Sequence, residues 1–278
     1  MSKNAALSYL PRQSVVHRLT GTAKLAFFLL WSTAAMLTYD TRLLAVMTVS
    51  GLWLFSISRI RWKEVKGALI FMLILVLMNL FAIFLFSPDQ GTKIYGTEHI
   101  ILPLFWRYNL TQETLFYLLN FFLKYSAVIP VALLFILATN PSEFAASLAG
   151  IGVSYKVGYS VALALRYIPD VQRDFHNISQ AQQARGIDLS GKDKTMTRLK
   201  NSAAILLPLV LSSLSRIETI SNAMELRGFG KHKKRSWYVQ RPFQGRDWAA
   251  LLVAIVVLCI SLGLTLAKGT RYFNPFQP

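Results

Sequence analysis

The chain has 278 residues, of which 54% are hydrophobic and only 15% are charged, and this composition is typical of membrane proteins. Its formal net charge of +17 could suit nucleic acid, but the basic residues flank apolar segments and no recognised nucleic-acid motif accompanies them, so we expect no nucleic-acid partner. The single cysteine, Cys259, excludes a disulfide framework and a thiolate metal site.

Apolar segments predict about five membrane-spanning helices, because about 20 apolar residues cross a bilayer core of about 30 Å. Lys24, at the start of the first segment, can snorkel towards the headgroups. Lys124 lies inside the fourth segment, where it is an ion-pathway candidate, has a buried partner or snorkels to the surface. The five segments run from Leu25 to Tyr39, Leu43 to Ser58, Gly67 to Ser87, Thr114 to Thr139 and Trp248 to Ala267.

The distribution of Lys and Arg predicts the orientation, since cytoplasmic flanks of membrane proteins collect these residues. With the N-terminus inside, the basic residues gather in the segment before the first span, in the connection between the second and third spans, and between Lys156 and Arg246. Few fall on the outer side. We therefore expect a multi-pass protein of a bacterial or archaeal plasma membrane, in contact with membrane lipids, with a cytoplasmic N-terminus.

Residues 140–246 differ in character, because no window there is both long and apolar enough to span cleanly. Asn140-Pro141-Ser142-Glu143 is a helix-start signal. A short amphipathic helix to Leu148 is expected to follow, and then two long helices of about 45 Å, with bends at their prolines. The predicted long helices run from Tyr155 to Arg185, with Pro169, and from Thr197 to Arg227, with Pro208.

We therefore predict an all-α polytopic fold with about five transmembrane helices and a cytoplasmic domain of long helices. The predicted domains are residues 1–139 with four spans, residues 140–246 with the two long helices, and residues 247–278 with the final span and a short tail.

The ends of the two long helices repeat one another. Residues 178–186 and 220–228 align at an offset of 42, with five identical positions and one Gln/Asn exchange. A glycine after the last turn and an arginine within it are also ordinary helix caps, which explains one such end but not the recurrence. Two equal ends suggest two similar partners. Each end presents a small residue four positions before an arginine, namely Ala181 before Arg185 and Ala223 before Arg227, so a planar fork of donors could enter a narrow groove.

At these residues the chain resembles the transmembrane T component of energy-coupling factor transporters, the family of cobalt and biotin permease subunits. The resemblance covers nearly the whole chain. It includes His17-Arg18-Leu19, Thr139-Asn140-Pro141-Ser142-Glu143 and Ala164-Leu165-Arg166-Tyr167-Ile168-Pro169. The family's two signatures correspond to Ala184-Arg185-Gly186 and Leu226-Arg227-Gly228, the second with leucine in place of alanine.

The resemblance implies a non-catalytic subunit that transmits ATP-driven motion to a substrate-binding subunit for uptake of a vitamin or a metal ion. Each signature would occupy a groove in one of two ABC ATPase subunits, and the apolar helix faces would cradle one small membrane-embedded substrate-binding subunit. No cofactor is expected, since ATP hydrolysis would belong to the partners.

Three other interpretations compete with this one. Residues 186–193 nearly match a P-loop, but Asp193 stands where Ser or Thr would bind magnesium. Asp170 and Asp174 share a helix face as in a membrane prenyltransferase, although pairing with Arg166 and Arg173 explains them more simply. A conventional ABC importer permease also couples through cytoplasmic helices, but usually offers one coupling loop per subunit.

Overall fold

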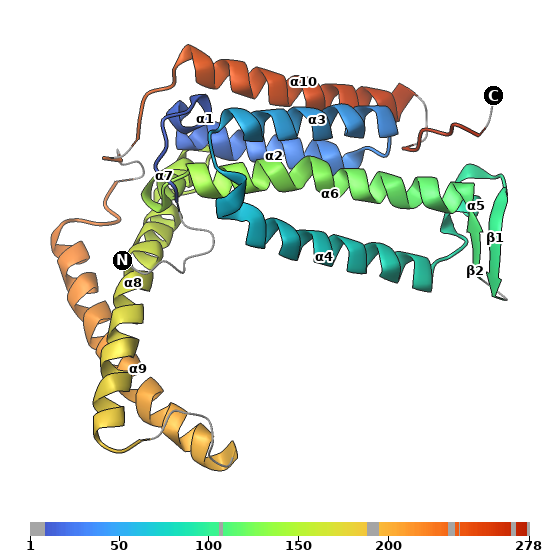
Figure 1. Cartoon of the computed structure of the whole chain (residues 1–278). Helices are drawn as coiled ribbons and strands as arrows, with labels where there is room; N and C mark the ends of the chain where they lie inside the picture. The colour runs from blue at the N-terminus through green and yellow to red at the C-terminus, as the bar shows by residue number, and fades with distance from the viewer. Residues whose placement is uncertain are drawn as a thin grey trace. The chain divides into compact units, whose positions relative to one another are not determined.

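A computed structural model describes residues 9–105, 108–187, 195–232, 237–238, 240–267 and 271–276, with the backbone alone for 103–105 and 195–200 (Figure 1). The described residues of 1–140 and 241–278 form one compact unit, and those of 141–240 form a second. The predicted domain boundaries lie after residues 139 and 246, and the cytoplasmic location of the second unit stays a prediction.

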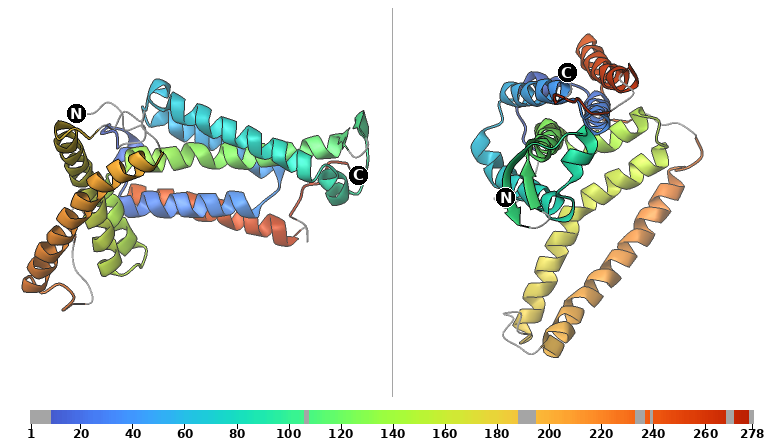
Figure 2. Two further views of the ribbon diagram at one scale, coloured as in Figure 1. Left: turned by 90° about the horizontal axis from the view of Figure 1, so that it is seen from below. Right: turned by 90° about the vertical axis from the view of Figure 1, so that its right-hand side faces the viewer.

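The first unit is a helical bundle around α6, the long central helix. α6 contacts α2, α3 and α4, while α10 packs along α2 (Figure 2). Small residues allow close helix approach, as at Gly51, where a Cβ atom would lie 3.4 Å from the carbonyl oxygen of Ala127. The helices of this unit are α1 (Val15–Arg18), α2 (Gly21–Leu37), α3 (Thr41–Ile57), α4 (Trp62–Phe86), α5 (Gln90–Tyr95), α6 (Gln112–Ala138) and α10 (Gly245–Ala267).

The helices confirm the prediction of an all-α polytopic membrane protein. Trp62–Phe86, Gln112–Ala138 and Gly245–Ala267 are long and apolar enough to cross a bilayer, whereas α2 and α3 are apolar but shorter. Asn201–Leu226 also meets the length and composition requirement, although it is the least apolar of the four candidate spans. We expect no clean span between residues 140 and 246 from the sequence, and for this segment that expectation stays a prediction.

Two buried lysines tie α2 and α6 together from opposite ends. Lys24 donates a hydrogen bond to the carbonyl oxygen of Ala138, the last residue of α6, at 2.8 Å. Lys124 donates to the carbonyl oxygen of Met36, near the end of α2, at 2.9 Å, and lies over the ring of Tyr39. Each lysine therefore supplies a donor and a positive charge to the carbonyl end of the neighbouring helix. The expectation that Lys24 snorkels is wrong, because its side chain is buried at this helix end.

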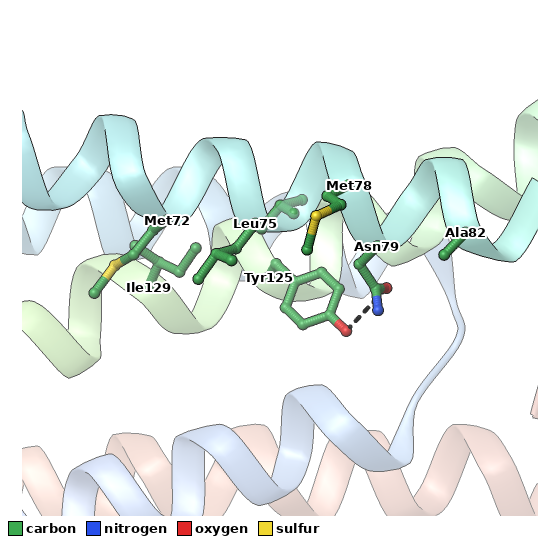
Figure 3. A pocket seen from close by; sticks show the side chains of 8 residues that line it. Met72, Leu75, Met78, Asn79, Ala82, Tyr125 and Ile129 are labelled. Carbon is green, nitrogen blue, oxygen red and sulfur yellow. Dashed lines mark hydrogen bonds between the residues drawn. The ribbon is translucent and has the colours of Figure 1, made fainter. Parts of the chain in front are cut away.

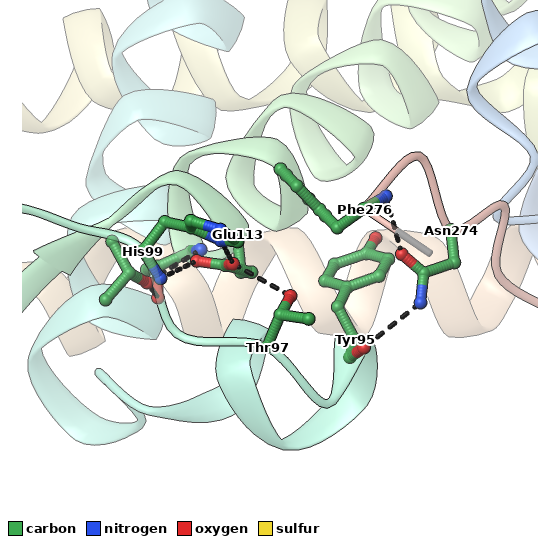
Figure 4. Close-up of polar contacts among 8 residues, drawn as sticks. Tyr95, Thr97, His99, Glu113, Asn274 and Phe276 are labelled. Carbon is green, nitrogen blue, oxygen red and sulfur yellow. Dashed lines mark hydrogen bonds and ion pairs between the residues drawn. The ribbon is translucent and has the colours of Figure 1, made fainter. Parts of the chain in front are cut away.

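The connection between α4 and α6 is structured. It contains α5 and an antiparallel hairpin of β1 (Ile100–Phe105) and β2 (Tyr108–Thr111). The fully buried Glu113 carboxylate accepts hydrogen bonds from the Thr97 hydroxyl and the His99 backbone N–H, and lies 2.7 Å from His99 Nδ1 (Figure 4). Burial raises the pKa of the nearby Tyr95 to about 12.

The second unit consists of α7 (Pro141–Gly150), α8 (Tyr155–Ala184) and α9 (Thr195–Leu226). α7 packs closely on the start of α8, where a Cβ atom on Gly158 would lie 2.9 Å from the carbonyl oxygen of Ala145 and 3.1 Å from the Trp237 ring. Both long helices end within a few residues of their predicted bounds. They also remain continuous through their prolines.

Candidate coupling site at two helix ends

The signature residues lie at the carboxyl ends of α8 and α9. At the end of α8, the Gly186 N–H donates to the Gln183 carbonyl at 2.9 Å and the Ile187 N–H donates to the Gln182 carbonyl at 3.1 Å. These two bonds define a Schellman cap, which requires a left-handed residue after the cap position. Gly186 meets this requirement with a φ of 85°.

The end of α9 repeats both hydrogen bonds of this cap. The Gly228 N–H donates to the Glu225 carbonyl at 2.8 Å, and the Phe229 N–H donates to the Met224 carbonyl at 2.9 Å. Gly228 has a φ of 66°. The sequence repeat is therefore also a repeat of backbone conformation, and it places Arg185 and Arg227 at the same cap position.

Both ends present their signature side chains at the surface. Leu226, which stands where the first signature has Ala184, is 90% exposed. An exposed leucine beside an exposed arginine at a helix end combines apolar contact with a fork of hydrogen-bond donors. The exposed residues are Ala181, Ala184, Arg185 and Gly186 on α8, and Ala223, Leu226 and Arg227 on α9, while Gly228 is partly buried.

The structure separates the two signatures, because α8 and α9 are antiparallel. The Gln182 side-chain amide, near the end of α8, donates to the Ala204 carbonyl, early in α9, at 3.1 Å. Phe229, just after α9, packs on Tyr155 and Tyr159 at the start of α8, with ring centroids 5.5 and 4.9 Å apart. Figure 1 shows the two helices crossing. The two ends thus lie at opposite extremes of the pair, about 40 Å apart at 1.5 Å per residue from Tyr159 to Arg185.

The acidic pair on α8 is engaged by arginines. Asp170 pairs with Arg173 on the same helix, as expected. Asp174 instead pairs with Arg216 of α9, with Oδ2 2.6 Å from Nη2, so the expectation that an arginine of its own helix engages Asp174 is wrong. Arg216 also lies over the ring of Tyr167 at 5.8 Å. Within the described residues, no group of three or more His, Cys, Asp or Glu side chains could hold a metal ion. The pairing of both aspartates with arginines does not favour the prenyltransferase alternative.

The near match to a P-loop lies mostly outside the described residues, since only Gly186 and Ile187 of residues 186–193 are placed. The element before it is the helix α8 and not the strand that a P-loop follows.

A separate groove of about 500 Å³ lies between α4 and α6 (Figure 3). Its lining is apolar except for Asn79 and Tyr125, whose hydroxyl donates to the Asn79 side-chain oxygen at 3.4 Å. These eight lining residues offer van der Waals contact to an apolar group and include no acid–base pair suited to catalysis. The lining residues are Met72, Leu75, Val76, Met78, Asn79, Ala82, Tyr125 and Ile129.

Sequence reasoning missed the contacts that hold the two signatures apart. The separation of Asp174 and Arg216 in the sequence equals the offset of the repeat, so extending the alignment backwards from the signatures would have drawn attention to them. No comparable feature of the sequence indicates the aromatic contact of Phe229 with Tyr155 and Tyr159.

Comparison with known proteins identifies the family. Residues 12–237 match the CbiQ family, described as cobalt transport protein. The chain belongs to this family. A relative from Lactococcus lactis subsp. cremoris, the energy-coupling factor transporter transmembrane protein EcfT, is 29% identical over 265 residues, which cover 91% of this chain and 94% of the relative. Proteins of the same name from Brevibacillus brevis and Staphylococcus aureus are 26% identical over 269 residues, with 94% and 98% of the two chains covered, and 27% identical over 263 residues, with 91% and 93% covered.

These relatives confirm the predicted role of this chain as the transmembrane component of an energy-coupling factor transporter. The chain is therefore a membrane transport protein that works with other subunits. The comparisons leave the roles of the signature residues, and the identity and number of the partners, as predictions.

Proposed function

We propose that the ends of α8 and α9 are the coupling contacts of this transporter component, each seated in a groove of one of two ABC ATPase subunits. Arg185 and Arg227 donate hydrogen bonds to carboxylate or carbonyl oxygens at the groove floor. Gly186 and Gly228 set the backbone turn that aims each arginine, and the exposed Ala184 and Leu226 fill the groove beside it. Ala181 and Ala223 keep the adjacent helix face narrow.

The observation that supports this proposal is that α8 and α9 both end in a Schellman cap. Two helices whose sequences differ before the signatures end with the same two Schellman hydrogen bonds, a left-handed glycine and an arginine at the same cap position. A cap that only satisfies the last carbonyl groups of its own helix does not require an exposed arginine with an exposed alanine or leucine beside it. Two similar ends pointing in opposite directions are suited to two similar partners.

The remaining surface of the long helices has a different role in this proposal. Their exposed apolar residues, which include Leu207, Leu211 and Ile217 of α9, cradle one small membrane-embedded substrate-binding subunit. ATP-driven movement of the ATPases shifts the two ends and tilts the bound subunit, which delivers a vitamin or a metal ion. The chain itself is non-catalytic, and its N-terminus and residues 140–246 face the cytoplasm.

Substitution of each arginine tests the coupling contacts. Arg185→Ala and Arg227→Ala are expected to abolish substrate uptake and weaken ATPase co-purification while the chain stays in the membrane. Arg185→Lys keeps the charge but loses the planar fork, and is expected to restore uptake only partly. Arg166→Ala, which removes another exposed arginine of α8, is the matched control and should transport normally. Normal uptake by both tip variants would contradict the proposal.

The stoichiometry of the complex tests the partner assignment. The tagged chain, purified in detergent from its native membrane, is expected to carry two ATPase subunits and one small hydrophobic protein, identified and counted by mass spectrometry. Two copies of this chain per ATPase pair would instead favour a conventional ABC importer permease.

A further inference from the structure

The two signatures also occupy equivalent positions at the ends of helices of similar length. Shifting α8 by the offset of the repeat places Tyr155–Ala184 on residues 197–226, which lie entirely within α9. The two helices therefore have equivalent lengths before their equivalent ends. Two equivalent helices that pack antiparallel are related by an approximate two-fold axis perpendicular to both. That axis passes through the point where a residue meets its own repeat equivalent.

Asp174 and Arg216 are that point. They are repeat equivalents, and they contact each other with Asp174 Oδ2 2.6 Å from Arg216 Nη2. The other contacts between the helices lie to either side, with Gln182 on Ala204 towards one end of the pair and Tyr159 on Phe229 towards the other. Opposite charges thus occupy the two equivalent positions that the packing of α8 on α9 brings together.

The two arms that extend from this contact are equal. Gly186 follows Asp174 at the same separation in the sequence at which Gly228 follows Arg216. At about 1.5 Å of rise per residue each arm is about 18 Å long. The two arms point in opposite directions, because the helices are antiparallel. Any change in the crossing angle at the contact therefore displaces the two ends by the same amount in opposite senses.

We propose that Asp174 and Arg216 form the pivot of the coupling helices and act as positioning residues that set the spacing and symmetry of the two signatures. This inference rests on the proposed function and adds the residues that determine where the two ATPase contacts lie. It also describes the partner surface, which is an ATPase pair whose own two-fold axis passes close to this ion pair.

The chemistry of the contact suits a pivot. Both side chains are about 30% exposed, and a partly exposed ion pair adds little to stability, so its main effect is on geometry. The ion pair lies between the other contacts of the two helices, Gln182 on Ala204 to one side and Tyr159 on Phe229 to the other, at the point about which the crossing angle is defined. The Tyr167 ring under the Arg216 guanidinium limits sideways movement of that side chain.

Charge reversal in the intact transporter tests the pivot. Asp174→Arg and Arg216→Asp each place like charges at the crossing, and the double variant restores an opposite pair in reverse. In the purified complex with its ATPases and substrate-binding subunit in liposomes, each single reversal is expected to lower substrate uptake per ATP hydrolysed by about tenfold. The double reversal is expected to return it to near the original ratio.

The distance between the ends of α8 and α9 is a second measurement, and a change in overall stability alone does not alter it. Because Cys259 is the single cysteine, Cys259→Ser gives a background for spin labels at Gln180→Cys and Asn222→Cys, which are exposed repeat equivalents. The single reversals should shift or broaden the distance between the labels, and the double reversal should restore it. Arg173→Asp, which disrupts the ion pair within α8 alone, is the control and should leave both readouts unchanged.

The outcomes separate this inference from the proposed function. Suppose that Arg185→Ala abolishes uptake while both single reversals keep the original uptake per ATP hydrolysed and the original distance between the labels. The proposed pivot is then wrong, and the proposed coupling contacts at the two helix ends remain supported. Failure of the double reversal to restore either readout also overturns the pivot. If a single reversal is absent from the membrane, Asp174→Asn removes the attraction without repulsion, and an unchanged uptake ratio and distance in that variant overturns the pivot equally.

Discussion

The left-handed glycine at the end of α8 offers a sharp test of the coupling geometry. Gly186 has a φ of 85°, and a Cβ atom at this position would meet nothing within 4 Å. Gly186→Ala therefore introduces no collision, and its effect is the cost of a left-handed backbone, about 1–2 kcal/mol for a residue with a side chain. That cost lowers the population of the Schellman end by a factor of about 5–30 relative to frayed alternatives.

The effect on binding follows from this population. A partner that binds only the closed end loses apparent affinity in proportion to the fraction of chains that display it. A helix end has few packing contacts to oppose fraying, so we expect most of the backbone cost to appear as weaker ATPase binding. Titration of the purified membrane component with its ATPase pair measures this affinity, and initial uptake rates in liposomes measure its consequence.

Two further variants isolate the cause. Gly152 also has a left-handed φ, of 97°, with no atom near its missing Cβ, but it lies in the turn between α7 and α8. Gly152→Ala carries the same backbone cost away from the signatures and should leave ATPase affinity unchanged. Gly186→Asn should recover part of the loss, because asparagine tolerates the left-handed region. Equal ATPase affinity for Gly186→Ala and the unaltered chain would refute the reasoning.

Three other substitutions test the packing of the two units. Lys124→Met leaves the Met36 carbonyl without its donor and should cost about 1–3 kcal/mol of stability, so the melting temperature in detergent should fall while uptake per ATP stays the same. Lost uptake with an unchanged melting temperature would instead place Lys124 on an ion path. Gly91→Ala brings a Cβ atom within 2.5 Å of the Glu113 and Thr114 backbone, so hydrogen exchange should accelerate over residues 90–111, whereas Gly67→Ala, in open space on α4, should not change it. Gly158→Ala should push α7 from α8 and lower the melting temperature, whereas Gly263→Ala, in open space on α10, should not lower it. Equal melting temperatures for these two variants would show that the close approach of α7 and α8 at Gly158 is not needed.

Helices were predictable from the sequence because their signals are local. The fourth predicted span, Thr114–Thr139, differs from α6 by one or two residues at each end, and Tyr155–Arg185 differs from α8 by one. Apolar runs and glycines just after a helix end act over a few residues, so they do not depend on the rest of the fold. The left-handed glycines at the two signatures were predictable for the same reason.

Contacts between distant residues were not predictable. The partner of Asp174 is Arg216 on the next long helix, whereas Arg166 and Arg173 of the same helix appeared sufficient to engage the acidic pair. Lys24 looked like a headgroup ligand because its buried acceptor, the Ala138 carbonyl, is 114 residues away. The β1–β2 hairpin escaped prediction because Pro103 interrupts its first strand and the second strand has only four residues.

The lengths of the helices in the first unit have a consequence for the surrounding lipid. α2 and α3 have 17 residues each, about 26 Å of helix, whereas α4 and α6 have 25 and 27 residues, about 38 and 40 Å. As spans, the first pair falls short of a hydrocarbon core of about 30 Å, and the second pair exceeds it. A shorter span thins the bilayer beside it, and a longer one tilts. The membrane should therefore be thinner beside α3 than beside α4, and lipid chain length should influence how readily a neighbouring membrane protein tilts next to α3.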